Sequence, residues 1–167
     1  MYADSGNNVV TVPGTVNAGD EGLFVSGDGN EITVSGTVIG EDLGVYALGS
    51  ANEVRVTDGG TVVGGSNQDG ADVVVFSAAV GFFDPLGHAN RLVIDGTLIA
   101  EENPDFADRR VAVLDGLTDG MGSSDLTILN NGLIDGEVLL GQGTDLYDGS
   151  GGAVSPAWWT GARGRTC

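Results

Sequence analysis

A short segment of the form N-x-φ-x-φ-x-G-T-φ, where φ is Val, Ile or Leu, recurs along the chain and restricts the folds available to it. Clear copies begin at Asn8, Asn30, Asn52 and Asn90, and a weaker copy, DLTILNNGLI, begins at Asp125. The first two intervals are 22 residues each, whereas the next two are 38 and 35 residues and leave room for two longer insertions. Self-similarity at a fixed period of this length is typical of architectures in which one structural unit stacks on the next.

Each copy predicts a β-strand with one buried face, because apolar and polar residues alternate and successive side chains of a strand point to opposite sides. A second apolar segment separates successive copies: GLFVSG at 22–27, GVYALG at 44–49, ADVVVFS at 71–77 and RRVAVLDG at 109–116. Clusters of Gly, Asp and Asn close these segments and favour turns. No segment shows the period of an α-helix, so we expect almost no helix.

The constant phase of the repeat favours stacked coils over antiparallel hairpins, because only stacking needs the same residue type at the same place in every unit. We therefore predict an all-β parallel β-solenoid (β-helix) with about 22 residues per basic coil. Two inward columns are expected: Val10, Ile32, Val54 and Leu92, and beside them Val12, Val34, Val56 and Ile94. An outward column is expected from Thr15, Thr37, Thr61 and Thr97, and a corner column from the four asparagines that begin the copies.

The charge balance excludes two classes of partner. The 167 residues include 24 Asp and Glu against 6 Lys and Arg, giving a formal net charge of −18, and Lys is absent. A surface this negative repels nucleic acid and anionic lipid. No apolar run approaches the roughly 20 residues of a membrane helix, so no membrane insertion is expected. The start, MYADSGNNVV, lacks the basic and apolar parts of a signal peptide, so the chain is cytosolic, exported by another route, or part of a larger protein.

The last copy continues into LLGQGTDLYDGSGG at residues 139–152, and here the sequence resembles two kinds of secreted repeat. From residue 7 to 154 the coils are similar to the β-helical passenger regions of bacterial autotransporters and surface adhesins. The core GQGTDLYDG is similar to one nonapeptide of the RTX, or haemolysin-type, calcium-binding β-roll, whose form is G-G-x-G-x-D-x-φ-x. The resemblance implies a secreted or cell-surface bacterial protein.

The RTX resemblance also implies a calcium site. Calcium prefers six to eight oxygen ligands, and in that family the glycine-rich turn supplies carbonyls while the aspartate supplies a carboxylate. The matching positions here are Gly141, Gly143 and Asp145, with Tyr147 as the inward apolar residue. The pattern is incomplete, because Leu140 replaces the first glycine and the next turn, GSGGAV, has no aspartate. The alternative is a glycine-rich turn that closes the last coil.

The chain is expected to form one solenoid domain over residues 1–154, followed by an atypical tail over 155–167. The tail sequence PAWWTGARGRTC contains both tryptophans and the single cysteine, Cys167, but no acidic residue. Two interpretations remain open. Trp158 and Trp159 cap the end of the solenoid, or the tail is a frameshifted reading of a longer calcium-binding array, since the codons of WWTGARGR permit a G-G-x-G-x-D-x-φ turn in another frame.

The expected function is structural and adhesin-like, with calcium and a glycan or other cell-surface ligand as partners. Self-association through the solenoid ends is also expected, because an uncapped end is a set of open sheet edges. The alternative is a carbohydrate-active β-helix enzyme of the polysaccharide lyase or glycosidase kind. Catalysis of that kind needs paired carboxylates or a basic residue in a groove, whereas turn aspartates are ordinarily solvated. His88, the single histidine, is expected to lie in a loop.

A third class, an ice- or crystal-binding face, is suggested by the threonine column. Such a face has to be flat and regular. The neighbouring outward column in the sequence is Thr11, Thr33, Arg55 and Val93, whose mixed character disfavours the class.

Overall fold

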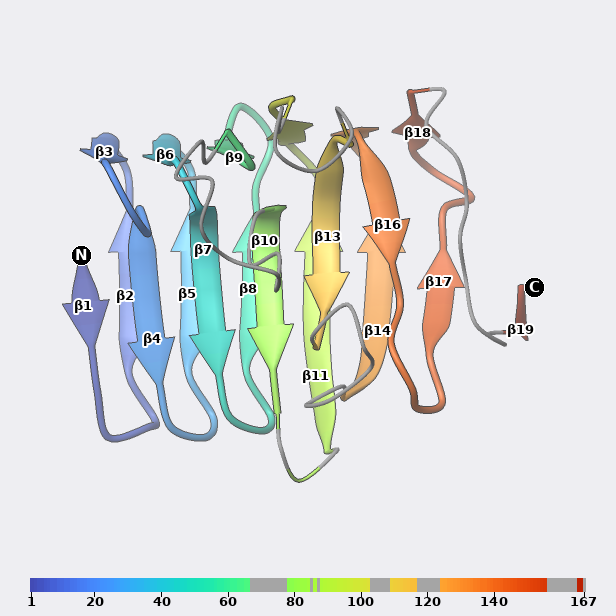
Figure 1. Cartoon of the computed structure of the whole chain (residues 1–167), viewed down its shortest axis with the longest axis horizontal. Helices are drawn as coiled ribbons and strands as arrows, with labels where there is room; N and C mark the ends of the chain where they lie inside the picture. The colour runs from blue at the N-terminus through green and yellow to red at the C-terminus, as the bar shows by residue number, and fades with distance from the viewer. Residues whose placement is uncertain are drawn as a thin grey trace.

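A computed structural model describes residues 1–66, 78–84, 86, 88–102, 109–116, 124–155 and 165–166 of the chain. Within these ranges the protein is all-β, and parallel strands form three sheets that run along the molecule (Figure 1). The predicted parallel β-solenoid is therefore confirmed. The strand expected over residues 71–77 lies outside the described residues, as does most of the 155–167 tail.

The three sheets are named A, B and C. In spatial order, sheet A contains β1 (Tyr2–Ala3), β4 (Leu23–Ser26), β7 (Leu43–Leu48), β10 (Ala78–Phe83), β13 (Val111–Asp115) and β16 (Glu137–Leu139). Sheet B contains β2 (Val9–Val12), β5 (Glu31–Val34), β8 (Glu53–Val56), β11 (Ala89–Ile94), β14 (Asp125–Asn130), β17 (Leu146–Asp148) and β19 (Arg165–Thr166). Sheet C contains β3 (Thr15–Ala18), β6 (Thr37–Gly40), β9 (Thr61–Gly64), β12 (Thr97–Ala100), β15 (Leu133–Asp135) and β18 (Ala153–Val154).

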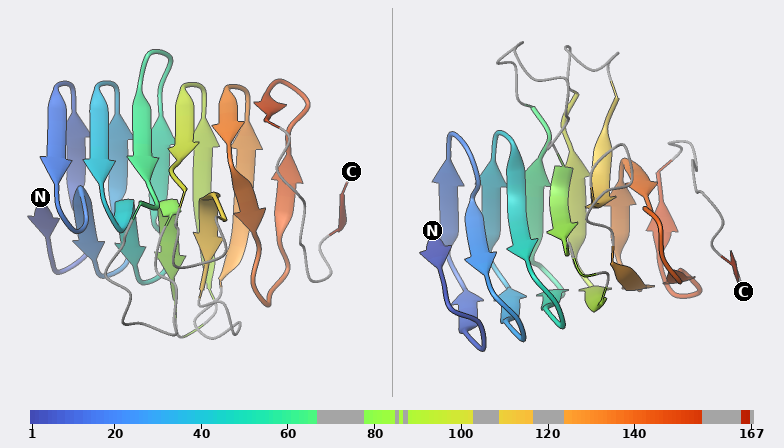
Figure 2. Two further views of the ribbon diagram at one scale, coloured as in Figure 1. Left: turned by 45° about the horizontal axis from the view of Figure 1, so that its top comes forward. Right: turned by 60° about the horizontal axis from the view of Figure 1, so that its bottom comes forward.

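Each basic coil passes through sheets B, C and A in turn and then begins the next coil, as the two views in Figure 2 show. The register confirms both predicted inward columns: Val10 pairs with Ile32, Ile32 with Val54, and Val54 with Leu92, with the second column two residues further on. Apart from Val10 in the first coil, these side chains are buried in one continuous core. Because every sheet contributes inward apolar residues to this core, apolar burial along the axis holds the coils together.

A column of glycines forms the corner between sheets B and C. A Cβ atom added to Gly36 would overlap the carbonyl oxygen of Gly14 in the preceding coil, and one added to Gly132 would overlap that of Gly96. Gly14 itself, in the first coil, has nothing within 4 Å of an added Cβ. The glycine of the repeat is therefore required by the close approach of successive coils at this corner.

The asparagines that begin the copies form the predicted corner column, and they are buried from Asn30 onward. Each side-chain oxygen accepts the backbone N–H of the asparagine one coil earlier: Asn30 from Asn8 at 3.0 Å, Asn52 from Asn30 at 2.9 Å, and Asn90 from Asn52 at 2.8 Å. The column thus satisfies backbone groups at a corner where the sheet ladder is interrupted.

The structure corrects the phase of the weak copy. Asn90 pairs with Leu126, one residue later than the predicted match with Asp125. The shift places Leu126 in the asparagine column and buries Asn130 in the inward column of Ile94. The insertion between β12 and β14 is therefore one residue longer than the sequence alignment implies, because alternation alone leaves the offset after an insertion undetermined.

Candidate functional site

Asp145, the carboxylate predicted to bind calcium, lies inside the solenoid. It occupies the asparagine column in the coil after Leu126, the residue that interrupts this column. Thr127 pairs with Leu146, which places Asp145 beside Leu126. Asp145 Oδ1 accepts the backbone N–H of Leu126 at 3.0 Å, the same bond that each asparagine makes to the coil before it. The residue is only 7 % exposed, and its Oδ2 has no hydrogen-bond partner among the described residues.

A second carboxylate, Asp115 at the end of β13, lies in an inward column of sheet A. That column contains Val25, Ala47 and Phe82 in earlier coils, and Asp115 is 1 % exposed. Its carboxylate accepts the hydroxyl of Ser124 at 2.8 Å and the backbone N–H of Ser124 at 3.1 Å. An acidic side chain thus takes a position that apolar residues fill in the coils before it.

Burial raises the pKa of both carboxyl groups, because the charged form loses its hydration. Burial raises the pKa of Asp115 to about 7, repulsion from Asp145 acts in the same direction, and hydrogen bonds from Ser124 and Gly141 oppose the shift. For Asp145, burial again raises the pKa more than the N–H of Leu126 lowers it, and Asp125 adds repulsion. The two groups therefore favour a bound proton or a bound cation over two free charges.

The glycine-rich turn before Asp145 is held against the preceding coil by a side-chain hydrogen bond and by close backbone packing. Asp125 Oδ1 accepts the N–H of Thr144 at 2.7 Å. Gly143 has a φ of +154°, and a Cβ atom there would overlap the carbonyl oxygen of Ser124. Tyr147 packs partly buried against the core, as its predicted inward position requires, and its Oη accepts Asn130 Nδ2 at 3.2 Å.

This arrangement fits a calcium ion only in part. The buried, unpartnered Oδ2 of Asp145 is an oxygen atom that a cation would satisfy, and the adjoining turn carries the carbonyl groups of Gly141 and Gly143. In the part of the chain that the structure describes, however, no group of three His, Cys, Asp or Glu side chains is placed to hold one metal ion. A calcium ion here would therefore take most of its ligands from carbonyl oxygens and water.

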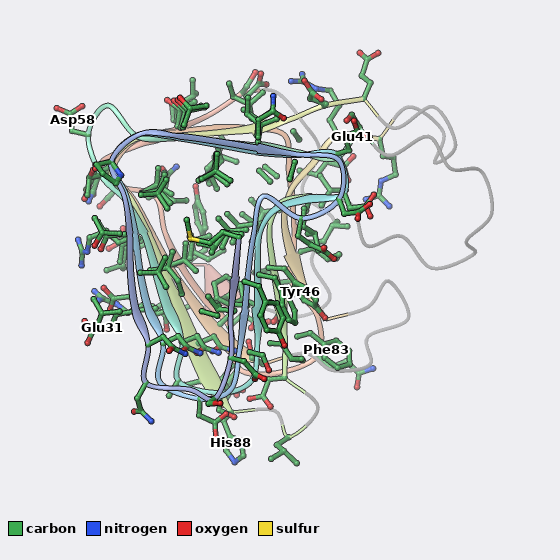
Figure 3. All side chains as sticks on the ribbon, turned by 90° about the vertical axis from the view of Figure 1, so that its left-hand side faces the viewer. Glu31, Glu41, Tyr46, Asp58, Phe83 and His88 are labelled. Carbon is green, nitrogen blue, oxygen red and sulfur yellow. The ribbon has the colours of Figure 1, made fainter. Side chains whose placement is uncertain are left out.

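A serine, an aspartate and the single histidine meet where sheet A turns into sheet B, near the His88 label in Figure 3. Ser50 Oγ donates to Asp84 Oδ2 at 2.9 Å and lies 3.1 Å from His88 Nδ1. Burial of Asp84 raises its pKa, but N–H groups of Leu86 and His88 and the Ser50 hydroxyl outweigh this effect and leave the pKa lowered. Asp84 therefore stays ionised and joins Leu86 and His88 to Ser50 of the neighbouring coil.

This cluster does not have the geometry of a nucleophilic triad. In a triad the histidine lies between the other two residues, using one ring nitrogen for each. Here Ser50 and Asp84 both face Nδ1, and the serine proton is directed to the aspartate rather than to the histidine. The cluster also contains a single carboxylate, whereas glycoside cleavage uses a pair. It therefore gives no support to the alternative of a carbohydrate-active enzyme, which stays a prediction.

Sequence reasoning found Asp145 but missed Asp115 and the Ser50 cluster. Asp115 could have been found, because alternation in RRVAVLDG places it on the same side as Val113. The serine and aspartate of the second cluster are 34 residues apart, and no pattern in the sequence links them. Aspartates at turns such as Asp28 and Asp58 are exposed, as expected, while Asp69 and Asp72 lie outside the described residues.

Comparison of the chain with protein-family models, with curated proteins and with solved structures gave no match. None of the described residues forms a helix long and apolar enough to cross a membrane.

Proposed function

We propose that this chain is a structural, adhesin-like β-solenoid segment of a secreted or cell-surface protein, and that its closing coil is stabilised by calcium. The observation that carries the calcium proposal is the buried Oδ2 of Asp145, which has no donor among the described residues. It lies in the one coil whose sequence has the G-x-G-x-D pattern, so motif and structure favour the same residue.

The structural role is supported by the way the chain uses its side chains. Inward columns, the asparagine column and the glycine corner all join one coil to the next along the axis. On the outside of sheet B, Glu53 forms ion pairs with Arg91 of the next coil and with Arg55 of its own strand, at 2.6 and 3.1 Å. A stack joined in this way is a stiff rod, and stiffness is what a stalk or scaffold requires.

The first experiment is thermal unfolding of the purified chain, followed by circular dichroism, in EDTA, in millimolar magnesium and in millimolar calcium. We expect a rise in Tm that is specific to calcium, because an ion that binds only the folded state stabilises it by about 2.7 kcal/mol at a concentration of 100 Kd. A calcium-dependent Tm shift no larger than the magnesium shift contradicts the calcium proposal.

Two variants separate a specific site from diffuse binding to an acidic surface. Asp145→Asn keeps an oxygen for the Leu126 N–H but removes the carboxylate, so it is expected to abolish the calcium shift. Asp58→Asn removes one exposed carboxylate at the corner between β8 and β9 and is expected to leave the calcium shift unchanged. An equal loss of the calcium-dependent Tm shift in both variants indicates diffuse binding only.

The open first coil supports self-association through the ends. Val9 and Tyr2, on the edge strands of sheets B and A, are 76 % and 64 % exposed, and the side-chain oxygen of Asn8 has no donor among the described residues. A second solenoid end would cover these groups and extend the column. Sedimentation in high salt, which screens the net charge of −18, tests this proposal; a Val9→Lys variant is expected to remain monomeric.

A further inference from the structure

The outer face of sheet C carries two regular columns, of which only the first was predicted from the sequence. One is the predicted threonine column, in which Thr15, Thr37, Thr61 and Thr97 pair in register. The other, two residues further along each strand, contains Asn17, Ile39, Val63 and Ile99. The mixed column of Thr11, Thr33 and Arg55 belongs to sheet B, so the objection to a regular face does not apply to sheet C.

From β3 to β12 this face is uncharged, in a protein whose net charge is −18. In β15 the two columns continue with Leu133 and Asp135, and Asp135 forms an ion pair with Arg110 at 2.7 Å. None of the eight residues of the two columns in β3, β6, β9 and β12 is acidic or basic, and in β6, β9 and β12 all six are partly exposed. Exposed acidic residues lie at the two corners that flank these four strands. Figure 3, viewed along the coil axis, shows sheet C as the side between the corner of Asp58 and the corner of Glu41, both of which are exposed.

The face is also rigid and periodic. Threonine, valine and isoleucine are β-branched, so each of these side chains has few rotamers and loses little entropy when it is held in place. Neighbouring strands in a sheet are about 4.8 Å apart, and alternate residues of a strand are about 6.7 Å apart. Hydroxyl and methyl groups therefore repeat in two dimensions on a nearly fixed lattice.

The charge and chemistry of the face narrow the choice of occupant. A second copy docked face to face would bring the acidic corners of both copies together, which repel. On β3, β6, β9 and β12 an ionic ligand finds no counter-charge, and a glycan chain finds no aromatic ring to stack on. The occupant that remains is itself an uncharged surface, with ordered hydroxyl groups at a fixed spacing.

We propose that the outer face of sheet C binds the surface of crystalline water, with Thr37, Thr61 and Thr97 at its centre. Each threonine hydroxyl both donates and accepts hydrogen bonds, as a water molecule in the lattice does. The methyl groups and the Ile39 column limit competing hydration of the same face. This binding does not require the calcium proposed for the closing coil, because the face lies on other strands.

The test compares ice shaping and ice recrystallisation inhibition for the folded chain and two matched variants. Thr61→Lys places a charge at the centre of the face, whereas Thr33→Lys places the same charge on the outer face of sheet B, away from the proposed site. We expect the wild-type chain to facet ice crystals at micromolar concentration and Thr61→Lys to need at least about ten-fold more protein, a loss of about 1.4 kcal/mol. Thr33→Lys is expected to match the wild type.

Circular dichroism establishes that each variant is folded, and Ile99→Lys replaces Thr61→Lys if the latter unfolds. Folded wild-type protein that leaves ice crystals unshaped overturns the proposal, as does equal activity of Thr61→Lys and Thr33→Lys. If the wild-type chain sediments as a dimer and Thr61→Lys dissociates that dimer, the face binds a second copy of the chain instead. This result also overturns the proposal. Repeating the assay in EDTA separates this proposal from the calcium site.

Discussion

Replacing Asn30 with alanine is expected to destabilise the first two coils strongly, although it removes only one small polar side chain. Asn30 is fully buried, and its Oδ1 accepts both the backbone N–H and the Nδ2 of Asn8, at 3.0 and 2.8 Å. Its Nδ2 donates to the carbonyl of Gly27 at 2.8 Å and to Asn52 Oδ1 at 2.9 Å. Alanine provides none of these four bonds.

The magnitude follows from these contacts. A typical intramolecular hydrogen bond contributes about 1 kcal/mol net, and a buried group left without a partner loses more. Water can replace bonds to the partly exposed Asn8, so we expect a loss of about 3 kcal/mol rather than the full sum. For a domain of this size that loss lowers Tm by about 6–12 °C.

Chemical denaturation measures the total loss, and hydrogen exchange locates it. Because a solenoid is stabilised by nearest-neighbour contacts, protection is expected to fall in β2 and β5 and to persist in β11 and β14. The control is Thr33→Ala in the same strand, whose outward side chain is partly exposed. If the free energies of unfolding of Asn30→Ala and Thr33→Ala lie within about 0.5 kcal/mol of each other, the structural role assigned to the asparagine column is refuted.

Three further predictions concern the closing coil and the glycine corner. The folded-state pKa of Asp115 is raised to about 7, so its protonated carboxyl contributes stability that is fully present below the unfolded pKa and is lost as pH rises through 7. In calcium-free buffer the free energy of unfolding should therefore fall by about 3 kcal/mol between pH 5 and pH 8. Asp115→Asn should flatten that slope in denaturation curves. Asp145→Asn should raise the free energy of unfolding by about 1 kcal/mol at pH 8 in EDTA, because it removes a buried charge and keeps the bond to Leu126; a decrease contradicts this reasoning. Gly132→Ala should destabilise the chain by about 3 kcal/mol because its Cβ would meet backbone of the preceding coil, whereas Gly19→Ala, whose Cβ meets nothing within 4 Å, should change Tm little.

The fold could be predicted because in-register stacking makes sequence and space repeat together. When each coil has 22 residues, the residue above Ile32 is necessarily Val10 and the residue below it Val54, so the inward columns and the asparagine column follow from the spacing. The glycine before each threonine follows in the same way, because it recurs at the corner where coils approach most closely.

Only the tertiary structure decided where the chain resumes its phase after each insertion and which columns share a sheet. The offset of Leu126, the entry of Asp115 and Asp145 into one interior corner, and the separation of the Thr61 and Thr33 columns onto two sheets all depend on where the coil bends. Alternation records only which side of a strand a residue occupies, and it carries no information about the angle between strands or the length of an insertion. Contacts along the axis were therefore determined by the sequence where the coils keep the 22-residue period, whereas the offset after an insertion and the contacts across the coil were decided by the folded structure.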